Sequence, residues 1–293
     1  MVVIVRPAGE RGHQTMGEDV ESFHSFDFAA CRVGMRNWGC LRVLNEDVVG
    51  GGGGVADHPH RDAEIFTYLL EGALEHTDSL SNERTRFEFA RASESKRSVP
   101  LQLISAGNGM RHAERNASGD ERCRLIQVWL TPNDDGHAPS YQQVACDVVP
   151  NDDGSAACAL LVSRDGRDGS ARARADASVY AVFLRAADGS GFRQRVGPGR
   201  IAYVHHCRGA AAELSTNGGA AARLGAGDGV AVREESSLAL RQAATRADDG
   251  ESELLVFDMD DPDVTWANAP VEEKFEMFKK RSRINLRSGL VDL

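Results

Sequence analysis

The stretch Asp57-His58-Pro59-His60-Arg61 leads into an apolar run at residues 65–70, and together they indicate a β-strand that carries a binding site. Side chains on a strand alternate between its two faces, so His58 and His60 would point to the same side. Two neutral imidazoles on one side can share an ion of iron, copper, nickel or zinc. Histidines two residues apart also occur by chance, so a surface loop is the alternative for this motif alone.

A second pair of candidate ligands changes that balance. His112 and Glu114 have the same spacing and follow a glycine-rich turn at residues 106–109. The interval between the two pairs leaves room for the hairpins of a β-barrel. Two strands that each present two ligands from one face can build a four-ligand site inside such a barrel, and we favour this interpretation.

Composition restricts the possible classes of protein. A chain of 293 residues predicts two domains or one large all-β unit. A hydrophobic fraction of 41% with 27% charged residues is typical of a globular protein with a sizeable core. The net charge of −10 argues against direct nucleic-acid binding, because neutralising phosphates requires clustered Lys and Arg.

The six cysteines are scattered and form no C-x-x-C pair, which predicts reduced thiols in an intracellular compartment. The compartment would be cytoplasmic, or nuclear in a eukaryote. No stretch is long and apolar enough to cross a bilayer, so no membrane association is expected.

Short strands separated by glycine-bearing turns predict an all-β fold. We expect a domain boundary near residue 140, a mobile loop at Gly50–Gly54, and a C-terminal helix over residues 270–280 that docks on the body. His205 and His206 are adjacent, so they would point to opposite faces of a strand and could not act as a ligand pair. The strands expected in the second half cover residues 179–185, 201–205, 210–215, 229–233, 237–243 and 253–259.

Several motifs resemble the pirin family of bicupins. The resemblance is continuous through residues 6–143, and the second half matches only in pattern, at 225–230 and 254–258. The motifs that carry it lie at residues 11–13, 23–28, 58–62, 68–72, 75–79, 105–114, 127–130 and 139–143.

This resemblance implies two cupin (jelly-roll) β-barrels packed together, with a short C-terminal helix. Residues 1–140 would form the metal-binding domain, and residues 141–293 a cupin-like domain that lacks metal ligands and carries the helical tail. It implies one mononuclear transition metal, usually iron, with nickel, copper, manganese and zinc as alternatives. Position by position, the implied ligands are His58, His60, His112 and Glu114.

Family members that resemble this chain include quercetin 2,3-dioxygenases, which open the central ring of a flavonol with dioxygen and release carbon monoxide. The implied substrates are therefore an aromatic small molecule and dioxygen. Glu114 is the candidate base for the flavonol hydroxyl, which requires it to be a weak or detachable ligand. The competing hypothesis is an iron-dependent, redox-sensing cofactor that binds a transcription factor.

Four more residues are candidates around the metal. Glu64 shares the strand parity of His58 and His60 and is expected to support the ligands, with an ordinary surface carboxylate as the alternative. Phe26, Phe28 and Trp129 are expected to line an aromatic pocket, with plain core packing as the alternative for each.

Overall fold

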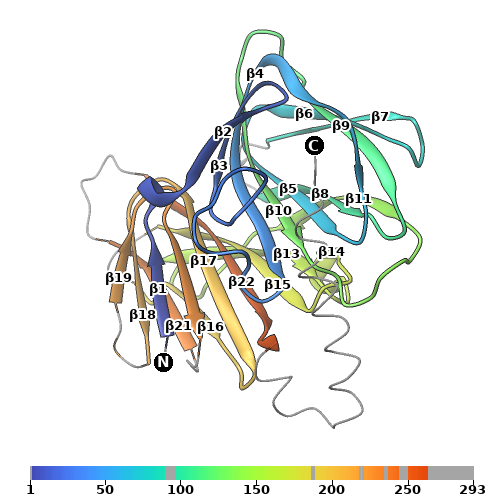
Figure 1. Cartoon of the computed structure of the whole chain (residues 1–293). Coiled ribbons are helices and arrows are strands. Elements are labelled where there is room, and N and C mark those ends of the chain that lie inside the picture. Colours follow the sequence, from blue (N-terminus) through green and yellow to red (C-terminus); the bar gives the residue numbers. More distant parts are fainter. Residues whose placement is uncertain are drawn as a thin grey trace, which may run out of the picture.

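The computed structural model describes residues 2–89, 97–185, 189–217, 219, 221–233, 237–243 and 250–262. These residues form curled β-sheets, with short 3-10 turns at Ala8–Glu10 and Arg167–Gly169, which confirms the predicted all-β fold (Figure 1). None of the helical segments in the described part of the chain is long and apolar enough to span a bilayer. The helix expected at residues 270–280 lies outside the described residues.

The first sheet has ten antiparallel strands, most of them from the first half of the chain. Its order is β11-β8-β5-β10-β4-β9-β6-β7, with β3 paired to β4 and β2 paired to β3. In Figure 1 these strands curl into a barrel at the upper right. The strands are β2 (Gly12–Met16), β3 (Glu18–His24), β4 (Leu41–His60), β5 (Glu64–Glu71), β6 (Ala73–Asp78), β7 (Arg84–Glu88), β8 (Ser98–Ser105), β9 (Met110–Asn116), β10 (Cys123–Leu130) and β11 (Ser140–Asp147).

Two further sheets form the second half. The larger has the order β1-β20-β17-β22-β15-β13-β12, with β14 paired to β13, and the smaller has the order β16-β21-β18-β19. Their strands are β1 (Val2–Arg6), β12 (Val149–Pro150), β13 (Ala156–Ser163), β14 (Ala171–Arg172), β15 (Ala177–Leu184), β16 (Phe192–Arg195), β17 (Arg200–Arg208), β18 (Ala212–Thr216), β19 (Ala221–Leu224), β20 (Gly229–Arg233), β21 (Ser237–Gln242) and β22 (Ser252–Asp260).

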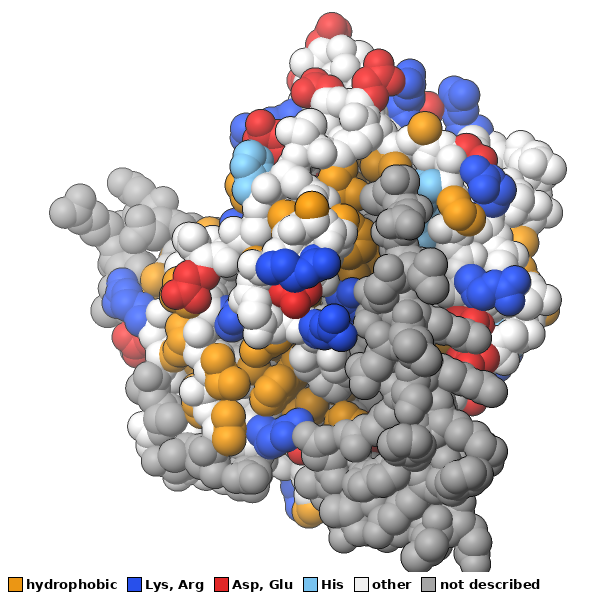
Figure 2. All heavy atoms as spheres, viewed as in Figure 1, with side chains coloured by type: hydrophobic (Ala, Val, Ile, Leu, Met, Phe, Trp, Pro, Cys, Tyr) orange, Lys and Arg blue, Asp and Glu red, His pale blue; other side chains and the backbone are white. Residues whose placement is uncertain are grey.

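Two strands cross the boundary expected near residue 140. β1 begins the chain but forms an edge of the second half's larger sheet by pairing with β20, and β11 pairs with β8 in the first sheet. Val2, Ile4 and Val5 of β1 are exposed, and Figure 2 shows hydrophobic side chains gathered where Figure 1 places this strand. The domain limits 1–140 and 141–293 stay a prediction.

A shared apolar core holds the two halves together. Phe66 and Leu101 from the first sheet lie in one buried cluster with Tyr203 and Phe257 from the second half. A separate cluster fills the space between the two sheets of the second half. Because apolar burial is the main favourable term in folding, the first sheet is fixed by its contact with the second half.

The expectation of a loop at Gly50–Gly54 was wrong, because the run lies within strand β4. A Cβ atom at Gly54 would lie 2.8 Å from the Cα of Arg115, and one at Gly53 would lie 3.1 Å from the carbonyl oxygen of Asp19. Gly53 and Gly54 therefore let neighbouring backbones approach β4 more closely than a side chain would allow.

We expect Gly54→Ala to lower the free energy of unfolding by about 1–3 kcal/mol, because β9 must move to admit the methyl group. Chemical denaturation measures the change. Gly119→Ala is the matched control, since a Cβ there meets nothing within 4 Å, and it should stay within about 0.5 kcal/mol of the unsubstituted protein. Equal stabilities of the two variants would contradict this reading of the glycine run.

Candidate metal centre

The pairing of β4 with β9 brings the two predicted ligand pairs together. His58 lies directly opposite His112, and Val55 lies opposite Glu114. A β-bulge lies between Val55 and His58, so β4 advances three residues where β9 advances two. Because directly paired residues share a face, the histidines of both strands point into the first barrel.

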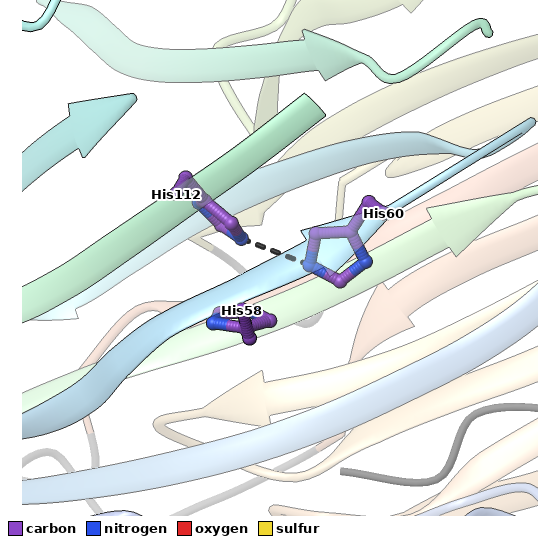
Figure 3. Close-up of side chains that lie close together, drawn as sticks. All are labelled: His58, His60 and His112. Atoms are coloured by element: carbon purple, nitrogen blue, oxygen red, sulfur yellow. Dashed lines mark hydrogen bonds between the residues drawn. The ribbon is translucent and has the colours of Figure 1, made fainter. Parts of the chain in front are cut away.

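Three imidazoles converge at this position (Figure 3). The Nε2 atoms of His60 and His112 are 2.9 Å apart, and one ligand atom from each of His58, His60 and His112 lies within 4.8 Å of the other two. Two nitrogens bound to one ion at about 2.1 Å and at right angles are about 3 Å apart, so the first spacing suits a shared ion. A hydrogen bond of 2.8 Å joins His58 Nδ1 to the Ala56 carbonyl, which leaves Nε2 with its lone pair.

Burial keeps these imidazoles neutral. It lowers the pKa of His60 to about 3, with a smaller contribution from His58. Burial also lowers the pKa of His112 well below its usual value, helped by His60. Neutral imidazole is the form that binds a transition ion, so the donor set fits such a metal.

Glu114 is buried and surrounded by donors. The side-chain amide of Gln127 donates to its Oε2 at 3.0 Å, and the amide of Gln102 donates to its Oε1. Burial raises the pKa of Glu114 to about 7 even though these hydrogen bonds lower it. Glu114 falls into a second group of potential ligands with His76 and His112, so its place in one set with His58 and His60 stays a prediction.

His76 was missed by sequence reasoning. It lies opposite Glu114 across the β6–β9 pair, and Asp78 lies opposite His112. The available signal was the spacing of His76 and Asp78, two residues apart on one strand, which matches the two pairs that were identified.

The aromatic residues predicted to line a pocket separate into two places. Trp129 stands edge-on to His60 with ring centroids 4.8 Å apart, and Phe28 stands edge-on to Trp129 at 5.5 Å. Phe26 instead packs against Tyr203 in the shared core. Trp129 and Phe28 are therefore beside the histidines, and Phe26 is not.

Glu64 is fully buried, which excludes the surface alternative. It accepts hydrogen bonds from Ser105 Oγ at 2.6 Å and from the backbone N–H of Arg174 at 3.1 Å. These contacts link the first sheet to a segment of the second half. A supporting role of Glu64 toward the metal ligands stays a prediction.

Comparisons with known proteins agree with this fold. Residues 5–130 match the family described as Pirin, and residues 160–259 match the quercetinase C-terminal cupin domain. A protein of Escherichia coli strain K12 named quercetin 2,3-dioxygenase is 34% identical over 262 residues, which cover 88% of this chain and 99% of that protein. A pirin-like protein of Caulobacter vibrioides is 33% identical over 74% of this chain and 85% of its own length. This chain belongs to the pirin family.

Solved structures show the same arrangement. YhhW from Escherichia coli matches with a TM-score of 0.72 at 31% identity, covering 88% of this chain and 97% of that one. The bacterial pirin YhhW in complex with nickel(II) matches with the same TM-score and identity, over 88% of this chain and 99% of that one. The resemblance noted in the sequence motifs is confirmed.

We expect nickel(II) at about a hundredfold excess over its Kd to stabilise the protein by about 2.7 kcal/mol, because the ion binds only the folded state. Thermal unfolding with and without nickel(II) measures this as a rise in Tm. His112→Ala should abolish the rise, whereas His13→Ala should keep it, because His13 is half-exposed and stacked on Phe23. A full rise in the His112→Ala protein would argue against this site.

Proposed function

We propose that this protein is a metal-dependent dioxygenase that opens the central ring of flavonols such as quercetin. The observation that carries the proposal is the cluster of three neutral imidazoles, in a chain 34% identical to a protein named quercetin 2,3-dioxygenase. That relative matches 88% of this chain, which favours the enzyme over the redox-sensing transcription cofactor. In the reaction both atoms of dioxygen enter the flavonol and carbon monoxide leaves.

The proposed metal ligands are His58, His60, His112 and Glu114. Iron is the ion expected from the family resemblance, and the nickel(II) complex of YhhW makes nickel the first alternative to test. A bound transition ion would act as a Lewis acid that lowers the pKa of the flavonol hydroxyl and would hold the substrate near dioxygen.

The protein side chains have separate tasks in this proposal. Glu114 Oε2 or Oε1 would accept the proton of the flavonol hydroxyl, since Gln102 and Gln127 hold its carboxylate in place. Trp129 and Phe28 would form an apolar wall for the aromatic rings beside His60. Their edge-on contacts would hold both rings in place before the substrate binds.

Incubating the protein with quercetin and iron, nickel, copper or manganese tests the activity. We expect the flavonol absorbance to fall and one carbon monoxide to be released per flavonol consumed. His112→Ala should lose the turnover together with the bound metal. If the unsubstituted protein binds metal but turns over no aromatic substrate, the result would contradict the dioxygenase and favour the redox-sensing transcription cofactor.

We expect Glu114→Gln to lower kcat by about a hundredfold or more, because an amide cannot take up the hydroxyl proton. Glu18→Gln serves as the control, since Glu18 is exposed and pairs with Arg115 at the surface. Steady-state kinetics and metal content should be measured on the same preparations. An unchanged kcat at full metal content would remove Glu114 as the base.

A further inference from the structure

A depression lies on the outer face of the small sheet formed by β16, β21, β18 and β19, in the second half of the chain. Its volume is about 350 Å³, which is within the range of small-molecule sites. In Figure 1 this sheet lies at the lower left, whereas the first barrel lies at the upper right. The side chains that line the depression from the outer face are Arg193, Glu213, Ser215, Arg223, Ala239 and Arg241.

Strand alternation explains what this face presents. Leu214, Leu238 and Leu240 belong to the buried cluster between the two sheets of the second half. The residues that alternate with them therefore point outward. Ser215 and Ala239 lie directly opposite each other on β18 and β21, and their small side chains form the floor of the depression.

The charges around this floor are unbalanced. Glu213 lies directly opposite Arg223 on β19 and opposite Arg241 on β21. Opposite charges in such positions commonly pair, but among the described residues none of the three lining guanidinium groups has a carboxylate oxygen within 4.0 Å. Together with Arg193, three guanidinium groups and one carboxylate leave a formal charge of +2, in a chain whose net charge is −10.

The three arginines are close enough to contact one ligand. Arg193 lies opposite Ala239, so it is diagonal to Arg241, two residues further along β21. The Cβ atoms of diagonal neighbours are about 7–8 Å apart, which long side chains can span. Arg223 and Arg241 come from the two strands that flank β18, about 10 Å apart. The three guanidinium groups can therefore converge over the floor.

We propose that this depression binds a small molecule that carries a phosphate monoester, with Arg193, Arg223 and Arg241 around the phosphate. The proposal is independent of the metal centre and of the proposed dioxygenase. A phosphate monoester carries nearly two negative charges at neutral pH, which matches the excess of positive charge. It presents three acceptor oxygens to several N–H groups, whereas a carboxylate has two oxygens that one guanidinium can occupy. The volume leaves room for the organic part of the ligand over Ser215 and Ala239.

Isothermal titration calorimetry of the full chain with glycerol 3-phosphate, inorganic phosphate and glycerol tests the proposal. We expect the ester to bind more tightly than inorganic phosphate, because its organic part contacts the floor, and glycerol not to bind. No binding of the ester at millimolar concentrations would overturn the proposal. Equal affinities for the ester and for inorganic phosphate would also overturn it, since the depression would then hold only a bare anion.

Two arginine variants locate the phosphate. Arg241→Gln should weaken binding of the ester by about tenfold or more, because a charge-assisted hydrogen bond is lost. Arg195→Gln is the matched control: Arg195 is exposed on the same face of β16 as Arg193 but does not line the depression, so the affinity should change by less than about twofold. Equal losses in the two variants would show attraction by general surface charge and would overturn the proposal.

Two further variants fix the sign of the charge effect and exclude the metal centre. Glu213→Gln should tighten binding of the ester by about two- to fivefold, because it removes a like charge beside the phosphate. His112→Ala should bind the ester as tightly as the unsubstituted protein, because His112 lies on a different sheet. Weaker binding in Glu213→Gln, or loss of binding in His112→Ala, would overturn the proposal.

Discussion

Strand register in the first sheet is the constraint on which both packing and site depend. Phe66, Tyr68 and Leu70 of β5 point into the core shared with the second half, whereas Thr67 points into the barrel beside Gln127. A slip of one residue would exchange the two faces of the strand. Burying each large apolar side chain stabilises the fold by about 1.5–3 kcal/mol, so a slip that exposes several of them is strongly disfavoured. Apolar packing on the outer face of the sheet therefore also determines which side chains point into the barrel from its inner face.

The inner face is organised around one carboxylate. Gln127, Thr67 and Gln102 are paired directly across β10, β5 and β8, and they form a polar row linked by hydrogen bonds of 2.8 and 2.9 Å. Both amides of this row donate to Glu114, which comes from β9. Burial raises the pKa of this carboxylate more than the hydrogen bonds from its neutral donors lower it. The barrel therefore holds a group that can exchange a proton near neutral pH.

Strand periodicity was enough to predict the all-β fold and to place His58 and His60 on one face, since both depend on alternation along single strands. Strand periodicity failed to predict local structure where that structure depends on backbone segments distant in the sequence. The glycine run was expected to be a loop, but β3 and β9 both pair with β4 there, and only tertiary pairing reveals that. His76 was not among the expected ligands, although it lies two residues from Asp78 on β6. Glu64 accepts hydrogen bonds from Ser105 and Arg174. Both residues are distant from Glu64 in the sequence, so local sequence could not identify them.

In the second half, strand β17 also carries two histidines, but they are adjacent instead of two residues apart. His205 and His206 are both fully buried on β17, and adjacent residues of a strand face opposite ways. His206 faces the cluster that includes Val204 and hydrogen-bonds the Ala210 carbonyl at 2.8 Å, whereas His205 lies on the same face as Tyr203, toward the shared core. Each ring thus lies next to an apolar cluster, and neither has a second imidazole on its own face of β17. Spacing by two residues, opposite another such pair, is what turns buried histidines into a convergent donor set, and in the described residues β4 and β9 provide that arrangement.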